Sequence, residues 1–270
     1  MPPTMKVLVY RHSVVTRVTH WINVVALTLL LMSGLQIFNA HPALYWGQKS
    51  TFADPWLSMT AEARGDEMVG LTRLGPLTLE TTGLFGFSGG ETRGFPAWAT
   101  APGYRNLADG RHWHFFFAWL FVLNGLVYLS AGGLSGHIRR DLLPSRADLA
   151  PRNLWHEVVT HARLRFPKGE AALRYNALQR LAYAGIALVV LPLMVLTGLA
   201  MSPGVDAGQP WLTAVFGGRQ SARTVHFLCA GLTLAFVLVH LAMVLLSGVW
   251  NNLRSMITGR YAIDLEKDAA

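Results

Sequence analysis

Four long apolar segments recur along the chain, and polar stretches separate them. Each is about 20 residues long, the length that an α-helix needs to cross roughly 30 Å of hydrocarbon. The segments cover residues 18–38, 114–134, 181–201 and 225–250. This pattern predicts an all-α integral membrane protein in which four transmembrane helices form one bundle, with residues 1–270 as a single membrane domain.

The first apolar segment also has features of a secretory signal peptide. Lys6, Arg11 and Arg17 precede it, and small residues follow it. Its apolar part is long for a signal peptide, and it contains His20, a histidine that the other spans need as a partner. We therefore expect this segment to be retained as the first membrane span.

The distribution of charge predicts the orientation in the membrane. Most of the 23 Lys and Arg residues lie before the first span, in the link at 135–180 and after the fourth span. Because cytoplasmic segments carry the excess of basic residues, both termini and this link are expected in the cytoplasm of a bacterium, with the loop at 40–112 outside its inner membrane. The net charge of +8 then follows from topology and from anionic lipids, so nucleic acid is not an expected partner.

Cysteine is nearly absent, since Cys229 is the single one in the chain. One thiol allows no internal disulfide, no four-cysteine iron–sulfur cluster and no CxxCH site for covalent haem attachment. Any haem in this chain is therefore held without a covalent link, by histidine nitrogens.

Four histidines lie in the apolar segments at depths that match in pairs. His226 and His240 are fourteen residues apart in the fourth segment, so on a helix they share a face to within about 40° and lie about 21 Å apart along the axis. By depth, His20 matches His240 near the cytoplasm, and His114 matches His226 near the outside.

Such pairs indicate bound iron. A lone histidine at a helix end is often only an interfacial polar residue, but ionisable groups inside a membrane are costly and mark functional sites. When two imidazoles bind one iron, each buried ring has a partner, and this arrangement suits a b-type haem. The ligands of a zinc ion would instead cluster around one point. The sequence predicts two non-covalent haem b groups, the inner iron bound by His20 and His240 and the outer iron by His114 and His226.

The second segment leaves a choice of ligand, because His112 and His114 lie on different sides of the helix. His114 is deeper, and Gly125 returns to its face, just as Gly34 returns to the face of His20. Each glycine thus lies near the level of the other haem, Gly34 near the outer one and Gly125 near the inner one, where a missing side chain would let a porphyrin approach the backbone. Close helix packing by small residues explains the same glycines.

These motifs resemble a known family. THW with His20, WHFFFAW with His114, the stretch LPLMVLTGLAMSP, and His226 with His240 are similar to the four-helix di-haem cytochrome b subunits of membrane hydrogenases, formate dehydrogenase-N and thiosulfate reductase. The resemblance implies an electron conduit between the quinone pool and a periplasmic partner, which would be a molybdoenzyme, a hydrogenase or an iron–sulfur subunit.

The stretch RYNALQRLAY before the third span resembles the YNxxQK motif of the formate dehydrogenase subunit, which lines a quinone pocket on the cytoplasmic side. The resemblance implies Tyr175, Asn176 and Gln179 as quinone contacts, with Arg180 near them. Helix capping at a membrane boundary explains the same polar residues. Three histidines of this link are candidates for proton relays or simply solvated side chains: His137, His156 and His161.

The loop at 40–112 is long and rich in Gly, Thr and Pro, with several aromatic residues. Loops of this length have a function or are disordered, and we expect a folded cap over the outer haem that receives the partner.

Two other classes of function compete with a partner-bound conduit. A stand-alone, quinone-coupled superoxide oxidase is the alternative, although the short chains of that type lack such a loop. A solute transporter would predict broken helices and internal repeats, and the sequence shows neither.

Overall fold

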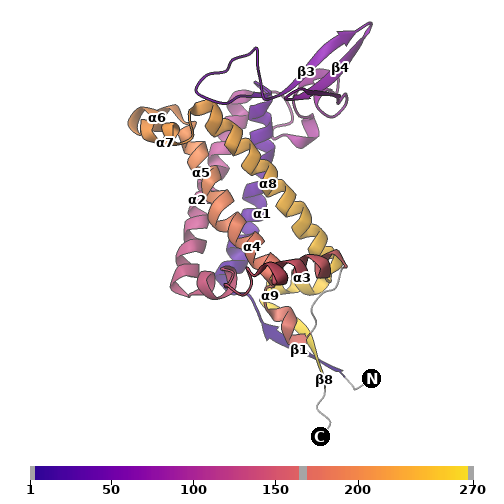
Figure 1. Cartoon of the computed structure of the whole chain (residues 1–270), viewed down its shortest axis with the longest axis vertical. Coiled ribbons are helices and arrows are strands. Elements are labelled where there is room, and N and C mark those ends of the chain that lie inside the picture. Colours follow the sequence, from indigo (N-terminus) through magenta and orange to yellow (C-terminus); the bar gives the residue numbers. More distant parts are fainter. Residues whose placement is uncertain (1–3, 164–168, 267–270) are drawn as a thin grey trace. The chain divides into compact units, whose positions relative to one another are not determined.

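Four long apolar helices lie in the part of the chain that the structure describes. The computed structural model describes residues 4–163 and 169–266. Its long helices are α1 (Val14–Phe38), α2 (Leu107–Leu134), the helix at 177–200, and α8 (Arg219–Leu246), shown in Figure 1. Each is long and apolar enough to cross a membrane. The prediction of four spanning helices is confirmed, and the chain is a multi-pass membrane protein.

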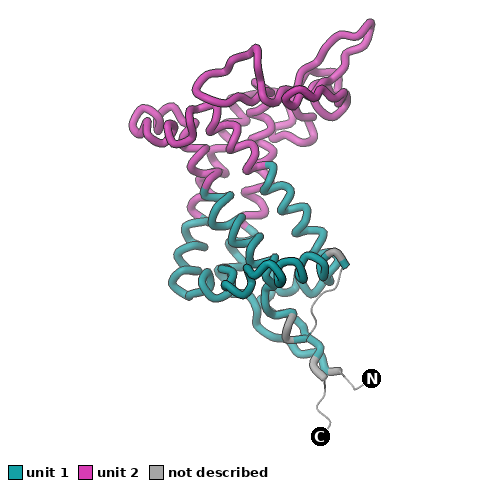
Figure 2. The backbone as a smooth tube through the Cα atoms, in the orientation of Figure 1, with its two compact units in different colours: residues 1–21, 124–192, 231–270 teal, residues 22–123, 193–230 magenta. Residues whose placement is uncertain are grey.

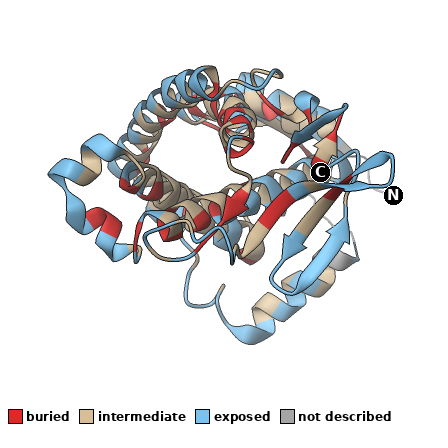
Figure 3. Cartoon of the chain, turned by 90° about the horizontal axis from the view of Figure 1, so that it is seen from above, coloured by how far each residue is buried: buried red, intermediate tan, exposed pale blue. Residues whose placement is uncertain are grey.

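Large apolar side chains cover the surfaces of these helices. Figure 3 shows long exposed stretches on them, and Trp119 of α2 and Leu238 of α8 are 70% and 60% exposed. Water is a poor solvent for such surfaces, while lipid tails suit them. The backbone polar groups are bonded within each helix, as a bilayer requires.

The third spanning helix changes its pitch in the middle. It consists of α4 (Ala177–Gly185), the π-helical segment η4 (Ile186–Val190) and α5 (Leu191–Ala200). Pro192 has no N–H to donate, and its ring crowds the carbonyl one turn earlier. A short π-helical segment before the proline accommodates this defect without breaking the helix.

The chain divides into two compact units, coloured separately in Figure 2. All four spanning helices contribute residues to both. The first unit contains residues 1–21, 124–192 and 231–270, and the second contains 22–123 and 193–230.

In the second unit the long loop contains β-structure, so the all-α prediction is confirmed for the spans and incomplete for the loop. Two antiparallel sheets have the strand orders β2-β3-β4-β5 and β6-β7. The β3–β4 hairpin turns at Gly65 and Asp66, where Gly65 takes the positive φ of +67° that such two-residue turns need. The remaining elements of this unit are β2 (Ala43–Leu44), β3 (Leu57–Arg64), β4 (Glu67–Leu74), β5 (Leu77–Glu80), β6 (Gly86–Ser88), β7 (Glu91–Arg93), η1 (Ala97–Ala99), α6 (Pro203–Gly208) and α7 (Pro210–Val215).

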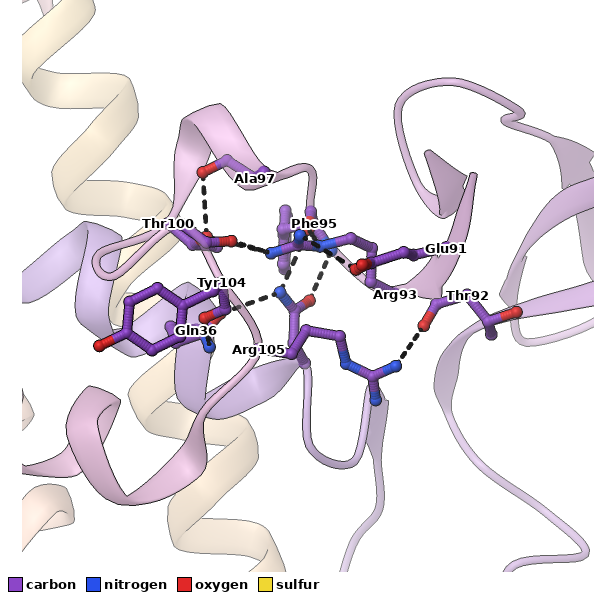
Figure 4. A network of polar contacts seen from close by, with 11 residues as sticks. Gln36, Glu91, Thr92, Arg93, Phe95, Ala97, Thr100, Tyr104 and Arg105 are labelled. Carbon is purple, nitrogen blue, oxygen red and sulfur yellow. Dashed lines mark hydrogen bonds and ion pairs between the residues drawn. The ribbon is translucent and has the colours of Figure 1, made fainter. Parts of the chain in front are cut away.

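A buried arginine organises the end of this loop. Arg93 is 4% exposed and donates hydrogen bonds to Thr100 and to the carbonyls of Phe95 and Gly103, as Figure 4 shows. Its other partner is the carboxylate of Glu91, at 3.6 Å. Buried charge is tolerated only when it is paired and hydrogen-bonded in this way.

The loop also fixes the beginning of α8. The carbonyl of Gly47 accepts hydrogen bonds from the backbone N–H groups of Gln220 and Ser221, which have no partner within the helix. Thr224, fully buried, donates to the carbonyl of Tyr45. The loop is therefore folded, as predicted, and it holds the helix that carries His226.

The first unit joins the two ends of the described chain. Strands β1 (Thr4–Tyr10) and β8 (Arg260–Glu266) pair in antiparallel register, which the sequence analysis did not predict. The fourth helix ends four residues before the predicted residue 250, because Gly248 adopts a left-handed conformation before α9 begins. The other elements of this unit are η2 (Ile138–Leu142), α3 (Pro151–Ala162), η3 (Gly169–Leu173) and α9 (Val249–Thr258).

Candidate functional site

Each unit contains one pair of facing imidazoles. In the second unit, the ring centres of His114 on α2 and His226 on α8 are 6.2 Å apart, and their planes are inclined by 63°. In the first unit, the ring centres of His20 on α1 and His240 on α8 are 6.4 Å apart, with planes inclined by 57°. These are the two pairs that the sequence predicts.

The separation within each pair fits one metal ion between two rings. A metal–nitrogen bond of about 2 Å on each side, plus roughly 1 Å from each nitrogen to its ring centre, gives about 6 Å in total. Two axial imidazoles are sufficient for haem iron, because the porphyrin supplies the other donors. Among the described residues there is no group of three or more His, Cys, Asp or Glu side chains that could hold an ion without such a macrocycle.

In the second unit the hydrogen bonds select which nitrogen is available. The Nδ1 atom of His226 lies 3.0 Å from the carbonyl oxygen of Met194. A carbonyl can only accept, so Nδ1 carries the proton and Nε2 keeps the lone pair that binds metal. Nδ1 of His114 lies 3.1 Å from the hydroxyl of Ser33.

Three buried polar atoms in the described part of the first unit have no hydrogen-bond partner. They are Nδ1 of His20 and the Nε atoms of Arg11 and Arg17, and Arg17 lies one turn before His20 on α1. Unpaired donors on cationic side chains suit the carboxylates of a haem, whose propionates need such partners. The residues of this unit therefore fit a haem as well.

Comparison with known proteins agrees with this geometry. The family model described as prokaryotic cytochrome b561 matches residues 11–259. The chain belongs to the prokaryotic cytochrome b561 family. Membership implies haem b and electron transfer in the membrane.

A curated relative has a more specific name. The putative protein-methionine-sulfoxide reductase subunit YedZ1 of Azospira oryzae is 30% identical over 243 residues, which cover 90% of this chain and 93% of the relative. No solved structure matches the chain.

In this cytochrome b561 chain, the structure favours His114 over His112 as the haem ligand of the second span. His112 is exposed, whereas His114 faces His226. Gly34 lies against the ring of His114, as its predicted closeness to the outer site requires. The space beside Gly125 is open, with no atom within 4 Å of where a Cβ would lie.

The three residues expected to contact quinone lie together at the start of α4. Asn176 is the N-cap: its side chain accepts from the N–H of Gln179, and the Gln179 side chain accepts from the N–H of Asn176. These residues therefore form the helix cap that was the other explanation for their polar side chains. Tyr175 packs edge-on against Tyr183 with ring centres 5.2 Å apart, and Tyr183 lies 6.4 Å from His240. An aromatic path thus leads from the predicted quinone residues to the inner pair.

The histidines of the link differ in their surroundings. His137 pairs with Asp141 at 2.7 Å, and His161 bonds to the side chain of Asn176. His156 is exposed, as expected of a solvated side chain.

Sequence reasoning missed His12, because it precedes the apolar segment and has no partner at a matching spacing. The structure buries it to 9% exposure. Burial and the neighbouring charge of Arg11 lower the pKa of His12 to about 4, so this imidazole is neutral in the folded protein at neutral pH.

This burial predicts a pH dependence of stability. The pKa of His12 is depressed in the folded state, so between about 6.5 and 4 the unfolded chain binds the proton and the folded chain does not. The stability contributed by neutral His12 is present above pH 6.5 and is lost as the pH falls toward 4. Thermal unfolding in detergent should show this loss, and His12→Gln should reduce it, whereas the exposed control His156→Gln should not. An unchanged pH profile in His12→Gln would contradict the assignment.

Proposed function

We propose that this chain carries electrons between the quinone pool and a periplasmic redox subunit by means of two haem b groups. The proposal rests on two facing imidazole pairs, His114 with His226 and His20 with His240. In each pair the rings are separated by the distance expected of two axial ligands on one iron. Each haem, when bound, would take up and release one electron at a time. The four histidines hold the irons, and the apolar helices exclude water from both sites.

Quinone reacts in this proposal at the unit that contains His20 and His240, on the cytoplasmic side. The aromatic contacts from Tyr175 through Tyr183 to His240 support this location. Burial raises the pKa of Tyr175, which keeps the phenol protonated and able to donate to a quinone carbonyl. Quinol oxidation releases two protons with two electrons, and the histidines of the adjoining link, including His137 with Asp141, are suited to accept them.

The partner is proposed as a periplasmic catalytic subunit that reduces oxidised methionine in proteins. The name of the Azospira oryzae relative supports this class. Reduction of a sulfoxide to a thioether and water consumes two electrons and two protons, the same number of each that one quinol supplies. The folded loop between α1 and α2 presents exposed aromatic side chains, among them Phe52 and Trp98 at 76% and 74%, and aromatic side chains are enriched at protein interfaces.

The haem assignment is tested by stoichiometry. The wild-type chain should contain about two haems by pyridine haemochrome, one for each imidazole pair. His114→Ala should lose one haem because it removes an axial nitrogen, and the matched control His112→Ala should keep both. Loss of a haem in His112→Ala alone would reverse the choice of ligand, and a wild-type value near one would refute the two-haem proposal.

The quinone site is tested with variants that preserve the helix cap. Asn176→Ser and Gln179→Glu keep an acceptor for the capping bonds, and Tyr175→Phe removes only a hydroxyl. These changes should slow quinol oxidation by about three- to tenfold, the effect of one lost hydrogen bond, while dithionite still reduces both haems. The exposed Tyr10→Phe serves as a control. Normal quinol kinetics in all three variants would place the site elsewhere.

Partner binding is tested by co-purification from native membranes. A methionine-sulfoxide reductase should accompany the tagged chain, and replacing Phe52 and Trp98 by Ala should weaken this association without loss of haem, because the aromatic contact area is removed. Trp250→Ala, which alters an equally exposed tryptophan of α9, is the matched control. Absence of any partner together with haem reduction by superoxide would favour the stand-alone superoxide oxidase.

A further inference from the structure

Two hydroxyl–glycine dipeptides lie against the histidines of the second unit. Ser33 and Gly34 follow each other on α1, and Thr197 and Gly198 follow each other on α5. Both hydroxyl residues are fully buried. Ser33 contacts His114 and Thr197 contacts His226, so each imidazole of this pair has its own dipeptide on a different helix.

The direction of the hydroxyl–imidazole bonds follows from the single proton of each hydroxyl. Ser33 donates to the carbonyl of Leu29 at 2.6 Å, four residues earlier on its helix. Its oxygen is therefore an acceptor toward Nδ1 of His114, at 3.1 Å.

The second dipeptide has the same arrangement. Thr197 donates to the carbonyl of Leu193 at 2.7 Å and accepts from Nδ1 of His226 at 3.0 Å, a proton that Thr197 shares with the carbonyl of Met194, also at 3.0 Å. In both cases the hydroxyl favours the tautomer with the proton on Nδ1, which leaves Nε2 for a metal.

The glycines bring the helix backbone up to the rings. A Cβ on Gly34 would lie 3.4 Å from Cε1 of His114, and a Cβ on Gly198 would lie 3.6 Å from Cε1 of His226. These distances already equal van der Waals contact, so a longer side chain would push the ring away. The hydroxyl thus fixes the rotation of each ring, and the glycine leaves space beside the ring for nothing larger than a methyl group.

We propose that Ser33–Gly34 and Thr197–Gly198 are positioning residues that set the redox potential of the haem held by His114 and His226. The inference rests on the proposed function, because it concerns a haem bound by these two histidines. An N–H···O bond at Nδ1 makes the imidazole a stronger electron donor, which stabilises oxidised iron and lowers the potential. In the first unit Nδ1 of His20 is buried without such a partner, so the two haems receive unequal donation from their ligands.

The test uses pairs of substitutions that differ mainly in the hydroxyl. Thr197→Val replaces the hydroxyl by a methyl group of similar size, and Thr197→Ser retains it; Ser33→Val and Ser33→Thr form the second pair. Thr28→Val is the matched control, because Thr28 bonds to the carbonyl of Val24 on the same helix in the same i−4 manner at an exposed position. Potentiometric titration of the purified holoprotein, followed by optical spectra and by electron paramagnetic resonance of the low-spin haems, gives the readout.

Ser33→Val should shift the reduction equilibrium of one haem by up to tenfold, about 59 mV for one electron, toward the reduced form. Thr197→Val should shift it in the same direction by less, because the carbonyl of Met194 still accepts from Nδ1 of His226. The hydroxyl variants and Thr28→Val should stay close to wild type, and the second haem should not change. If Thr197→Val loses the haem instead, retention in Thr197→Ser supports the proposal, and loss in both overturns it. Equal potentials in the valine and hydroxyl variants also overturn it, whereas a wild-type chain with one haem refutes the two-haem assignment itself.

Discussion

The arrangement of this protein depends on a requirement of neutral imidazole inside a membrane helix. The ring has one nitrogen that donates and one that accepts, and neither can turn to water among apolar side chains. At His226 the donor is satisfied by the carbonyl of Met194 and by Thr197, which leaves Nε2 as the acceptor, and the ring centre of His114 lies 6.2 Å from that of His226, a separation suited to iron. The same requirement explains why His114 faces Ser33 and Gly34 rather than a larger apolar residue.

The loop between α1 and α2 contributes to this geometry through polar bonds at the helix ends. The carbonyl of Gly47 caps the first N–H groups of α8, and Arg93 holds the segment that leads into α2. Unpaired backbone groups and a buried guanidinium would each be costly alone, so the loop folds as sheets that satisfy them. Hydrogen bonds from the folded loop therefore hold the first turn of α8, which carries His226, and the segment that leads into α2, which carries His114.

The residues of the link that are proposed to contact quinone also cap a helix. Asn176 and Gln179 satisfy the orphan N–H groups of α4 by a reciprocal pair of hydrogen bonds, which fixes where the helix begins. That start places Tyr175 against Tyr183, and Tyr183 beside His240. The helix cap is thus compatible with the proposed quinone site, because it orients the aromatic side chains that lead to His240.

The sequence by itself determined the four spans and the depth of each histidine, since hydropathy and axial rise are properties of a single helix. Its motifs carried the resemblance to the family. It also favoured His114 over His112, by depth and by Gly125 on the same face. It did not reveal Thr197 and Gly198 as neighbours of His226, the burial of His12, or the unpaired donors of Arg11 and Arg17, and it missed the sheets of the long loop. Only the tertiary structure decided these, because the rotation of one helix against another, and the cross-strand pairing of a loop, depend on contacts between residues far apart in the chain.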